Sequence, residues 1–335
     1  MAEGTRRRRR GGRHRGAPPL VAALDLGTNN CRLLIARSSR GGDLRVVDSF
    51  SRIVRLGEGV AQSGLLSEAA IERTVEALKI CARHLAAKGV SRLRAVATEA
   101  CRRAANADVL LARARAEAGL ALEIISAEEE ARLAAIGCAP LIDGSAEGAL
   151  IFDIGGGSTE IIWMRRAAEG AVPRVVASAS EPVGVVTLSE SGGAAGYAAM
   201  RAAMIDRFAA VKGRFDGIAP FEPAGQHLLG TSGTVTTLAA VALGLPRYER
   251  ARVDASWHRC SDIAAVIDRL VNLDLKGRAA MGAIGADRAD LIVPGCAIFA
   301  GIAASWPCAR LRVADRGLRE GILRELMGRT PAERP

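Results

Sequence analysis

Residues 149–162 read ALIFDIGGGSTEII and carry the strongest structural signal in the chain. An apolar run ends at Asp153, and Gly155, Gly156 and Gly157 follow at once, which indicates a buried strand that stops at a carboxylate and then turns. Because glycines have no Cβ, their N–H groups can approach an anion closely, so this turn predicts a phosphate site. Asp153 would repel the phosphate unless a hard cation such as Mg²⁺ lay between them.

A second copy of this pattern lies near the start of the chain. Residues 20–35 read LVAALDLGTNNCRLLI, another apolar run that ends in an Asp-x-Gly turn at Asp25 and Gly27. Two such turns, separated by about the length of one domain, predict two similar domains that face a shared phosphate site. A length of 335 residues and a hydrophobic fraction of 49% fit two domains with sizeable cores.

Strand and helix patterns alternate along the chain, which is typical of an α/β fold whose sheets are covered on both faces. The predicted domains are 19–140 and 141–317, with the boundary in the loop 139–147, and the helix 318–330 is a candidate to complete the first domain. Strands are expected at 20–26, 32–36, 44–53, 93–97, 122–125, 149–154, 160–164, 175–179 and 228–229, and helices at 67–88, 107–118, 194–211 and from 235 onward.

The net charge of +10 is concentrated in residues 1–18, a predicted disordered, Arg-rich tail. Residues 1–16 hold seven Arg and one Glu, a charge of +6, which leaves +4 for the rest of the chain. Such a run is most often a solvated extension or the product of an upstream start codon; the alternative is a nonspecific contact for RNA, polyphosphate or an acidic membrane. An aromatic fraction of 3% argues against a base-stacking surface for nucleic acid.

Several protein classes are disfavoured by what the sequence lacks. No apolar stretch of about 20 residues follows the tail, so neither a secretory signal nor a membrane anchor is expected. Seven scattered cysteines without a CxxC pattern are typical of a reduced, cytoplasmic protein and indicate no zinc site. The P-loop, GxGxxG and GxSxG patterns are missing, which argues against P-loop, dinucleotide-binding and Ser–His–Asp enzymes.

Three carboxylates open the predicted helix in EIISAEEEARLAAIGC, residues 123–138. Ser126 and Glu129 have the spacing of a capping box, and Glu128 has the spacing to pair with Arg132. These structural roles leave Glu130 unexplained at a helix N-terminus that can face a cleft. Glu130 is therefore a candidate catalytic carboxylate.

Two further segments are candidate anion sites. LLGTSGTVTT, residues 228–237, places a Gly-Thr-Ser-Gly loop at the start of a helix, which suits an anion and equally suits an ordinary strand–helix connection. AVATEACRRAAN, residues 95–106, places Arg102 and Arg103 after a buried strand. One of them could hold a phosphate oxygen, while a solvated helix face is the simpler reading for Arg103.

Taken together, DLGTNNCRL, ATEACRRAAN, ISAEEEARL, FDIGGGSTE, LGTSGT, RADLIVPG and DRGLREGIL resemble the Ppx/GppA phosphatases, which are exopolyphosphatases and guanosine pentaphosphate (pppGpp) phosphohydrolases. The resemblance runs from about residue 20 to residue 323 and fits a short form with two core domains. It implies the fold of actin and the sugar kinases, which is RNase H-like, with the active site in a cleft between the domains. It also implies removal of a terminal phosphate by water with the help of Mg²⁺.

The resemblance also assigns roles to residues. It implies that Glu130 activates the water, and that Asp153 and Glu160 lie near the metal and the water. The positions expected to bind phosphate are Asp25, Gly27, Thr28 and Asn29 in the first loop, Arg102, then Gly155, Gly156, Gly157, Ser158 and Thr159, and finally Gly230, Thr231, Ser232 and Gly233.

These features predict a Mg²⁺-dependent hydrolase that releases orthophosphate from the end of polyphosphate, with pppGpp as the alternative substrate. Polyphosphate is favoured because no segment indicates a guanine pocket. Two remoter alternatives stay open: an actin-fold kinase, and a non-catalytic nucleotide-binding protein that contacts RNA through the tail. A homodimer stays open as well.

Overall fold

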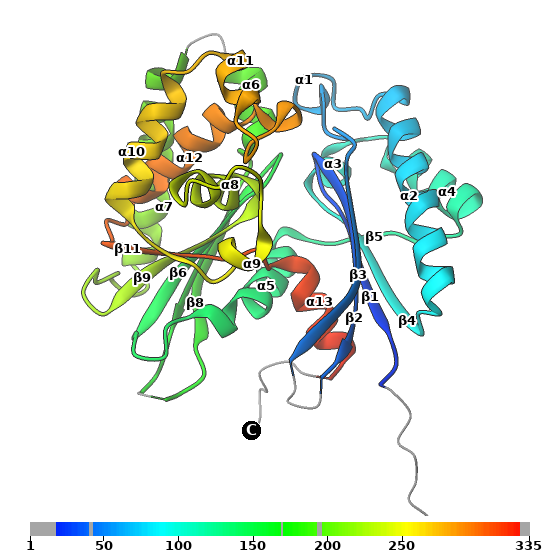
Figure 1. Ribbon diagram of the computed structural model, residues 1–335, viewed down its shortest axis with the longest axis horizontal. Helices are drawn as coiled ribbons and strands as arrows, with labels where there is room; N and C mark the ends of the chain where they lie inside the picture. The colour runs from blue at the N-terminus through cyan, green and yellow to red at the C-terminus, as the bar shows by residue number, and fades with distance from the viewer. Residues whose placement is uncertain (1–17, 40–42, 169, 193–195, 329–335) are drawn as a thin grey trace, which may run out of the picture.

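The computed structural model describes residues 18–39, 43–168, 170–192 and 196–328. The chain forms two halves, each built on a β-sheet with helices packed against it (Figure 1). Apart from Pro18, the predicted Arg-rich tail lies outside the described residues, and so does the RNA or polyanion contact expected of it.

The first sheet has five strands in the order β3-β2-β1-β4-β5. β1, β2 and β3 form an antiparallel meander. On the other side of β1, the strands β4 and β5 add to the sheet in parallel. The strands are β1 Val21–Leu26, β2 Asn30–Ser38, β3 Leu44–Ile53, β4 Arg92–Ala97 and β5 Glu123–Ile124, and the helices of this region are α1 Val60–Ser63, α2 Glu68–Lys88, α3 Glu99–Arg103 and α4 Ala107–Ala118.

The second sheet has six strands in the order β10-β11-β9-β6-β7-β8. Its strands are β6 Gly148–Ile154, β7 Thr159–Arg165, β8 Arg174–Glu181, β9 Gln226–Thr231, β10 Trp257–Arg259 and β11 Arg310–Val313. Its helices are α6 Val185–Gly192, α7 Gly196–Asp216, α8 Ser232–Ala242, α9 Arg250–Val253, α10 Cys260–Val271, α11 Leu275–Ala280 and α12 Ile292–Ser305, with a 3₁₀ turn at Ala286–Arg288.

The two sheets share one topology. β6, β7 and β8 form an antiparallel meander like β1, β2 and β3, and β9 and β11 continue it in parallel as β4 and β5 do. β10 is an added edge strand that pairs antiparallel with β11. The prediction of two similar α/β domains is therefore confirmed.

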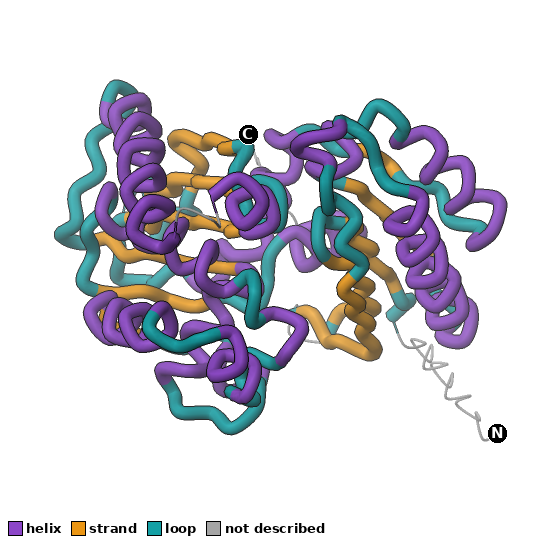
Figure 2. Tube along the Cα trace, turned by 90° about the horizontal axis from the view of Figure 1, so that it is seen from above, coloured by secondary structure: helices purple, strands orange, loops and turns teal. Residues whose placement is uncertain are grey.

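Two helices lie between the sheets: α5 Ala127–Cys138 and α13 Leu318–Leu326 (Figures 1 and 2). Ala131 and Ala134 of α5 pack on the second sheet, whereas Leu133 packs with α13 against the first. We propose the domain limits 19–140 and 141–317, with α13 completing the first domain. The described helix ends at Leu326, short of the predicted residue 330, and Gly328 follows with φ of 68°.

Local sequence signals explain the elements that were predicted. The Ser67 side chain accepts a hydrogen bond from Ala70 N at the start of α2, and Gly89 ends that helix with φ of 61°. The buried helix α12 was not assigned from the sequence, because IVPGCAIFAGIAAS is apolar on all sides and has no helical period. None of the helices in the described part of the chain combines the length and the apolarity needed to cross a bilayer.

The contact of α5 with α13 depends on glycine. A Cβ at Gly137 would lie 2.0 Å from Gly317 O, and a Cβ at Gly321 would lie 2.0 Å from Leu133 O. Backbone atoms cannot move aside as a flexible side chain can, so these two glycines set the distance between the helices and hence between the sheets.

We expect Gly321→Ala to lower the free energy of unfolding by about 1–3 kcal/mol, because the added methyl group overpacks this crossing. Gly213→Ala is the matched control, since Gly213 is an exposed helical glycine with open space around its Cβ position. It should raise stability by about 0.5–1 kcal/mol. Urea unfolding measures both, and equal effects would contradict the packing role of Gly321.

Candidate active site

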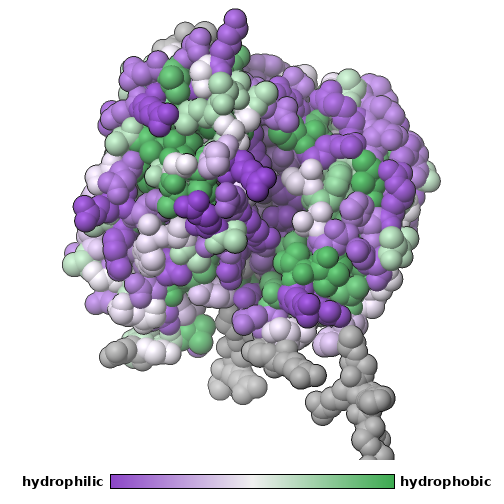
Figure 3. All heavy atoms as spheres, viewed as in Figure 1, coloured by the Kyte–Doolittle hydropathy of each residue, from purple (hydrophilic) through white to green (hydrophobic). Residues whose placement is uncertain are grey.

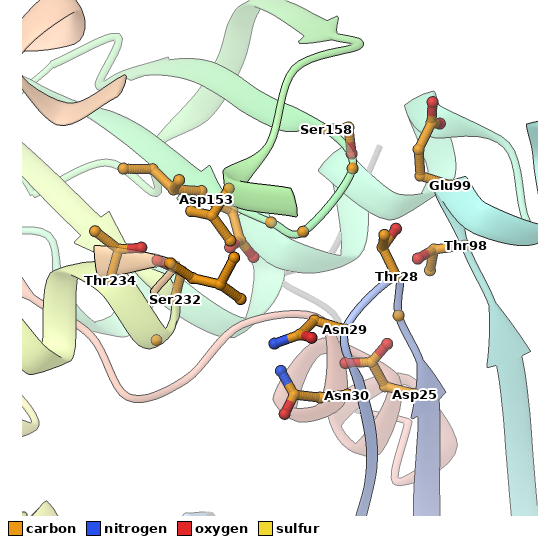
Figure 4. Close-up of a pocket in the computed structure, with 18 of the residues that line it drawn as sticks. Asp25, Thr28, Asn29, Asn30, Thr98, Glu99, Asp153, Ser158, Ser232 and Thr234 are labelled. Carbon is orange, nitrogen blue, oxygen red and sulfur yellow. The ribbon is translucent and has the colours of Figure 1, made fainter. Parts of the chain in front are cut away.

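A cavity of about 120 Å³ lies where loops from the two halves meet. Residues 27–30 follow β1, residues 155–158 follow β6, and residues 232–234 open α8. Figure 4 shows Asp25, Thr28 and Asn29 from the first half facing Asp153 and Ser232 from the second. Each of the two Asp residues lies one position before the end of its strand, as the repeated sequence pattern predicted.

Five carboxylates line the cavity: Asp25, Glu99, Glu130, Asp153 and Glu160. Burial raises the pKa of Asp153 to about 6, with the charge of Asp25 as a further cause. Burial likewise raises the pKa of Glu160 to about 7, and the charge of Asp153 adds to the effect. The site therefore concentrates negative charge, which a bound cation or protons would offset.

Asp153 and Glu160 are directly opposite each other in the antiparallel pairing of β6 with β7. Side chains at such positions point to the same face of the sheet, and like charges there destabilise the pair. The Glu160 Oε1 accepts hydrogen bonds from Ser158 Oγ at 2.7 Å and Ser180 Oγ at 2.9 Å. These bonds hold the carboxylate in one orientation, and because they stabilise its charged form they oppose the rise of its pKa. The sequence motif DIGGGSTE is thus a hairpin that places two acids together.

Glu130 enters the cavity from the first turn of α5. Burial is the largest cause that raises its pKa well above the ordinary range, followed by the charge of Glu160, and Arg102 opposes the shift. Arg102 Nη1 donates to Glu130 Oε2 at 2.8 Å. A desolvated carboxylate with a raised pKa is a stronger base than an ordinary glutamate.

The neighbours of Glu130 have structural roles. Ser126 Oγ accepts from Glu129 N at 3.2 Å, which forms one half of the predicted capping box. The other half is not formed, because the Glu129 carboxylate pairs with Arg132 at 2.7 Å and with Arg94 at 3.0 Å. Arg132 therefore pairs with Glu129 and not with Glu128.

Arg102 does not line the cavity and lies behind Glu130. Its guanidinium donates to Glu99 Oε2 at 2.9 and 3.1 Å, to Glu130, and to the Ile125 carbonyl at 3.0 Å. The structure thus places Arg102 one layer from the cavity, between two of the carboxylates that form its wall. Its contact with phosphate stays a prediction.

The glycines of the second loop serve the close approach of the two halves. A Cβ at Gly156 would lie 2.9 Å from Thr28 Cβ, and one at Gly157 would lie 2.7 Å from Thr28 Oγ1. A Cβ at Gly184 would in turn lie 2.4 Å from the Gly156 carbonyl carbon. Side chains at these positions would push the loops apart and open the cavity.

Most of the predicted phosphate-binding residues line the cavity, and four do not: Arg102, described above, and Thr159, Gly230 and Thr231. The lining set is Asp25, Gly27, Thr28, Asn29, Gly155, Gly156, Gly157, Ser158, Ser232 and Gly233. The Thr159 hydroxyl instead donates to the Val183 carbonyl at 2.6 Å, and the Thr231 hydroxyl donates to the Arg316 carbonyl at 2.7 Å. Gly230 packs against the Phe152 ring so closely that a Cβ added to the glycine would lie 2.6 Å from Phe152 Cζ.

Two arginines of the cavity were missed in the sequence. Arg32 is opposite Asp25 in the pairing of β1 with β2. Working out the register of this hairpin from the sequence would have placed Arg32 beside the predicted site. Arg288 opens the RADLIVPG segment and reaches the cavity from a 3₁₀ turn. Together they lower the local excess of negative charge.

Unpaired polar atoms also face the cavity. Among the described residues, Asn29 Oδ1, Asn30 Oδ1, Ser232 Oγ and Thr237 Oγ1 are buried without a hydrogen-bond partner. Ser232 also has φ of 100°, a conformation that a residue other than glycine rarely adopts. Buried polar atoms and strain of this kind mark a ligand site.

The donor set fits Mg²⁺ in part. No group of three or more His, Cys, Asp or Glu within the described ranges is arranged to hold a metal ion. Mg²⁺ is commonly held by one or two carboxylates together with phosphate oxygens of the substrate, so such a group is not required. Asp153 and Glu160 supply two hard oxygen donors whose mutual repulsion a divalent cation would relieve.

Residues 34–330 match the model of the Ppx/GppA phosphatase family. The chain belongs to this family. It is 33% identical over 323 residues to Exopolyphosphatase 2 of Mycobacterium tuberculosis, covering 92% of this chain and 98% of the relative. It is also 31% identical over 317 residues to the guanosine-5'-triphosphate,3'-diphosphate pyrophosphatase of Photobacterium profundum, covering 93% of this chain and 60% of that protein.

A crystal structure of the Ppx/GppA family member from Aquifex aeolicus superposes with a TM-score of 0.74 at 29% identity, covering 94% of this chain and 99% of the other. The predicted family, its two-domain actin-like fold and a hydrolase that acts on phosphoanhydride bonds are therefore confirmed. The relatives carry two different substrate names, so the choice of substrate is a separate question.

We expect Asp153→Asn to stabilise the metal-free protein at about pH 8, by roughly 1–3 kcal/mol. Because the folded-state pKa of Asp153 is raised to about 6 from 3.8, its contribution to stability is present below pH 3.8 and is lost as the pH rises through 6. The gain from the substitution should therefore disappear near pH 4. Thermal melts in EDTA across this pH range measure it, with Asp206→Asn at an exposed position of α7 as the control for the substitution itself.

Proposed function

We propose that this Ppx/GppA family member is an exopolyphosphatase, which hydrolyses the terminal phosphoanhydride of inorganic polyphosphate and releases orthophosphate. The observation that carries the proposal is the placement of Glu130 in one cavity with Asp153 and Glu160, walled by loops of both halves. Within one small cavity, this arrangement offers a base, carboxylates for a divalent cation, and loops whose backbone N–H groups suit a phosphate.

In this mechanism Glu130 removes a proton from the attacking water. The raised pKa of Glu130 strengthens it as a base, and the ion pair with Arg102 holds the carboxylate in place and opposes that rise in pKa. The Glu99 carboxylate holds the opposite side of the Arg102 guanidinium, so Arg102 positions Glu130 through a fixed network.

The terminal phosphate is held by donors from both halves. The proposed donors are the backbone N–H groups of Gly156 and Gly157 and the Thr28 hydroxyl, all from residues that line the cavity. Arg32 and Arg288 add positive charge. Asp153 and Glu160 would hold Mg²⁺, which offsets charge on the transferring phosphoryl group.

The similarity to an exopolyphosphatase supports polyphosphate as the substrate, since the chain is 33% identical to that relative over 323 residues. The guanosine pentaphosphate alternative is kept because identity to the relative named for a guanosine nucleotide is nearly as high, at 31%. A cytoplasmic location would fit the seven free cysteines, of which Cys31 and Cys81 share a hydrogen bond between sulfur atoms 4.0 Å apart and form no disulfide.

The decisive experiment is release of orthophosphate from polyphosphates of graded length and from pppGpp, each with and without Mg²⁺. An exopolyphosphatase releases one orthophosphate after another from the polymer, and the release depends on the metal. Hydrolysis of pppGpp alone would assign the second substrate, and ATP-dependent transfer to an added hydroxyl compound would indicate a kinase.

Glu130→Gln should keep the fold and lower turnover by about 10²–10⁴-fold, because the amide cannot accept the proton of water. Glu129→Gln is the matched control: this carboxylate is engaged in ion pairs with Arg132 and Arg94, so the change should cost at most about 1 kcal/mol of stability and little turnover. Steady-state kinetics compares the two. Similar losses of turnover at both positions would mean that Glu130 is not the base.

Asp153→Asn should raise the Mg²⁺ concentration needed for half-maximal activity and lower turnover, since one anionic oxygen donor is lost. Binding of orthophosphate in the absence of metal should be unchanged or tighter, because a repulsive charge has gone. A Mg²⁺ titration of activity and metal-free phosphate binding test this. An unchanged Mg²⁺ midpoint at full turnover would leave Asp153 with a role in the turn only.

A further inference from the structure

Two polar contacts join the halves beside the cavity. Arg55 Nη2 donates to Asp290 Oδ2 at 3.1 Å, and Gly59 N donates to Glu190 Oε1 at 2.8 Å. Arg55 and Gly59 lie in the loop after β3, whereas Glu190 lies in α6 and Asp290 just before α12. Figure 3 shows hydrophilic side chains along the groove between the two halves. Neither Glu190 nor Asp290 lines the cavity, so their influence on it passes through the elements that they join.

The loop after β3 is attached to the residues of the cavity that follow β1. Val54 N and Arg55 N donate to the Asn29 carbonyl at 2.9 and 3.1 Å, and Gly57 N donates to the Thr28 carbonyl at 2.9 Å. A Cβ at Gly57 would lie 2.2 Å from Thr28 Cγ2, so the two segments are in close contact. A shift of this loop would therefore move Thr28 and Asn29 with it.

On the other half, α6 is attached in the same way to the glycine loop that follows β6. Val185 N donates to the Gly155 carbonyl at 3.0 Å, and Val186 N donates to the Gly156 carbonyl at 2.8 Å. Glu190 lies one turn further along this helix. The contact between Gly59 and Glu190 thus connects the supports of the two predicted phosphate loops.

The contact of Asp290 gives a role to the RADLIVPG segment, residues 288–295. Arg288, Leu291 and Ile292 of this segment line the cavity. Asp290 lies between them in sequence and pairs with Arg55 of the other half. The ion pair therefore ties one wall of the cavity to the loop that supports the opposite wall.

Each of the two carboxylates takes its hydrogen bond from the other half. Glu190 Oε2 and Asp290 Oδ1 are buried and have no hydrogen-bond partner among the described residues, so each carboxylate is bound through its second oxygen. A carboxylate that loses its donor in such a place is destabilised, which disfavours separation of the halves. Arg55 also has φ of 47°, a strained conformation that persists where surrounding contacts fix it.

We propose that Asp290 and Glu190 are positioning residues, which hold the two halves at the separation where the loops 27–30 and 155–158 bind the same phosphate. The inference rests on the proposed function in one respect, namely that the ligand of these loops is a phosphate. When the contacts are broken, a smaller fraction of the protein can bind the ligand with both loops. The apparent dissociation constant rises in proportion to that loss.

Asp290→Asn tests the proposal, because it removes the charge and keeps the shape of the side chain. We expect the dissociation constant for orthophosphate and KM for tripolyphosphate to rise roughly three- to tenfold, with kcat within about twofold, since a bound phosphate itself draws the two loops together. The midpoint of urea unfolding should change little, because the side chains of Arg55 and Asp290 are 41% and 38% exposed.

Glu76→Gln is the matched control. Glu76 forms an ion pair with Lys79 at 2.9 Å within α2, so this pair does not join the halves. The substitution should leave the affinity for orthophosphate and both kinetic constants unchanged. A rise in KM equal to that of Asp290→Asn would mean that the effect belongs to any lost surface ion pair, and would overturn the proposal.

Substitutions of Glu190 test the second contact independently. Glu190→Ala should weaken orthophosphate binding as Asp290→Asn does. Glu190→Gln should recover most of the affinity, because its amide oxygen can still accept the hydrogen bond from Gly59 N. Unchanged orthophosphate affinity in both Asp290→Asn and Glu190→Ala would overturn the proposal, and so would a loss of kcat without any change in KM.

Amide hydrogen exchange provides a readout that does not depend on a ligand. Asp290→Asn changes the second half, yet exchange should become faster at residues 54–59 of the first half, because their cross-half contact is weakened. Exchange in α10, which is remote from this contact in the sequence of the second half, should stay as in the wild type. Unchanged exchange at residues 54–59 would overturn the proposal.

The failure of the proposed function would look different. If the wild-type protein releases no orthophosphate from polyphosphate, the exopolyphosphatase assignment fails, while orthophosphate binding by the wild type and by Asp290→Asn still tests the positioning role. Tighter binding by the wild type would support that role in the absence of turnover. Equal binding would overturn it, and a wild-type protein that binds no orthophosphate would overturn both.

Discussion

Repulsion between buried carboxylates is the constraint on which the rest of this structure depends. Asp153 and Glu160 face each other across a hairpin, and the charges of Asp25 and Glu130 add to theirs. Like charges in a desolvated space are tolerated only when the surrounding packing fixes them, and here the buried strands of two sheets do so. Under the proposed function, a divalent cation and the phosphate that accompanies it would relieve this repulsion.

The two halves hold this cluster together through backbone contacts as well as through side chains. Thr28 of one loop meets Gly156 and Gly157 of the other so closely that no side chain fits between them. At the edge of the cleft, Arg55 pairs with Asp290 at 3.1 Å, and Gly59 N donates to Glu190 at 2.8 Å. The glycine crossing of α5 and α13 sets the spacing on the other side, so the cavity is bounded by tight contacts at both ends.

How much of this could be predicted depends on whether the signal is local. The turns at Asp25 and Asp153 were predictable, because a strand, an acid and glycines adjoin in sequence. Arg32 and Arg288 were not, since they reach the cavity through strand register and a tertiary approach of the halves. The uniformly apolar α12 offered no period from which its type could be assigned. Arg102 was identified, but only the fold places it behind the cavity wall.

The charge of the carboxylate cavity bears on how a phosphate chain could enter it. Five carboxylates and two arginines line the cavity, so a polyanion is repelled unless a divalent cation is present. The cavity has a volume of about 120 Å³, and each further phosphate brought into it adds charge to the same small space. Under the proposed function, charge and size therefore both favour a single terminal phosphate over an internal segment of the chain.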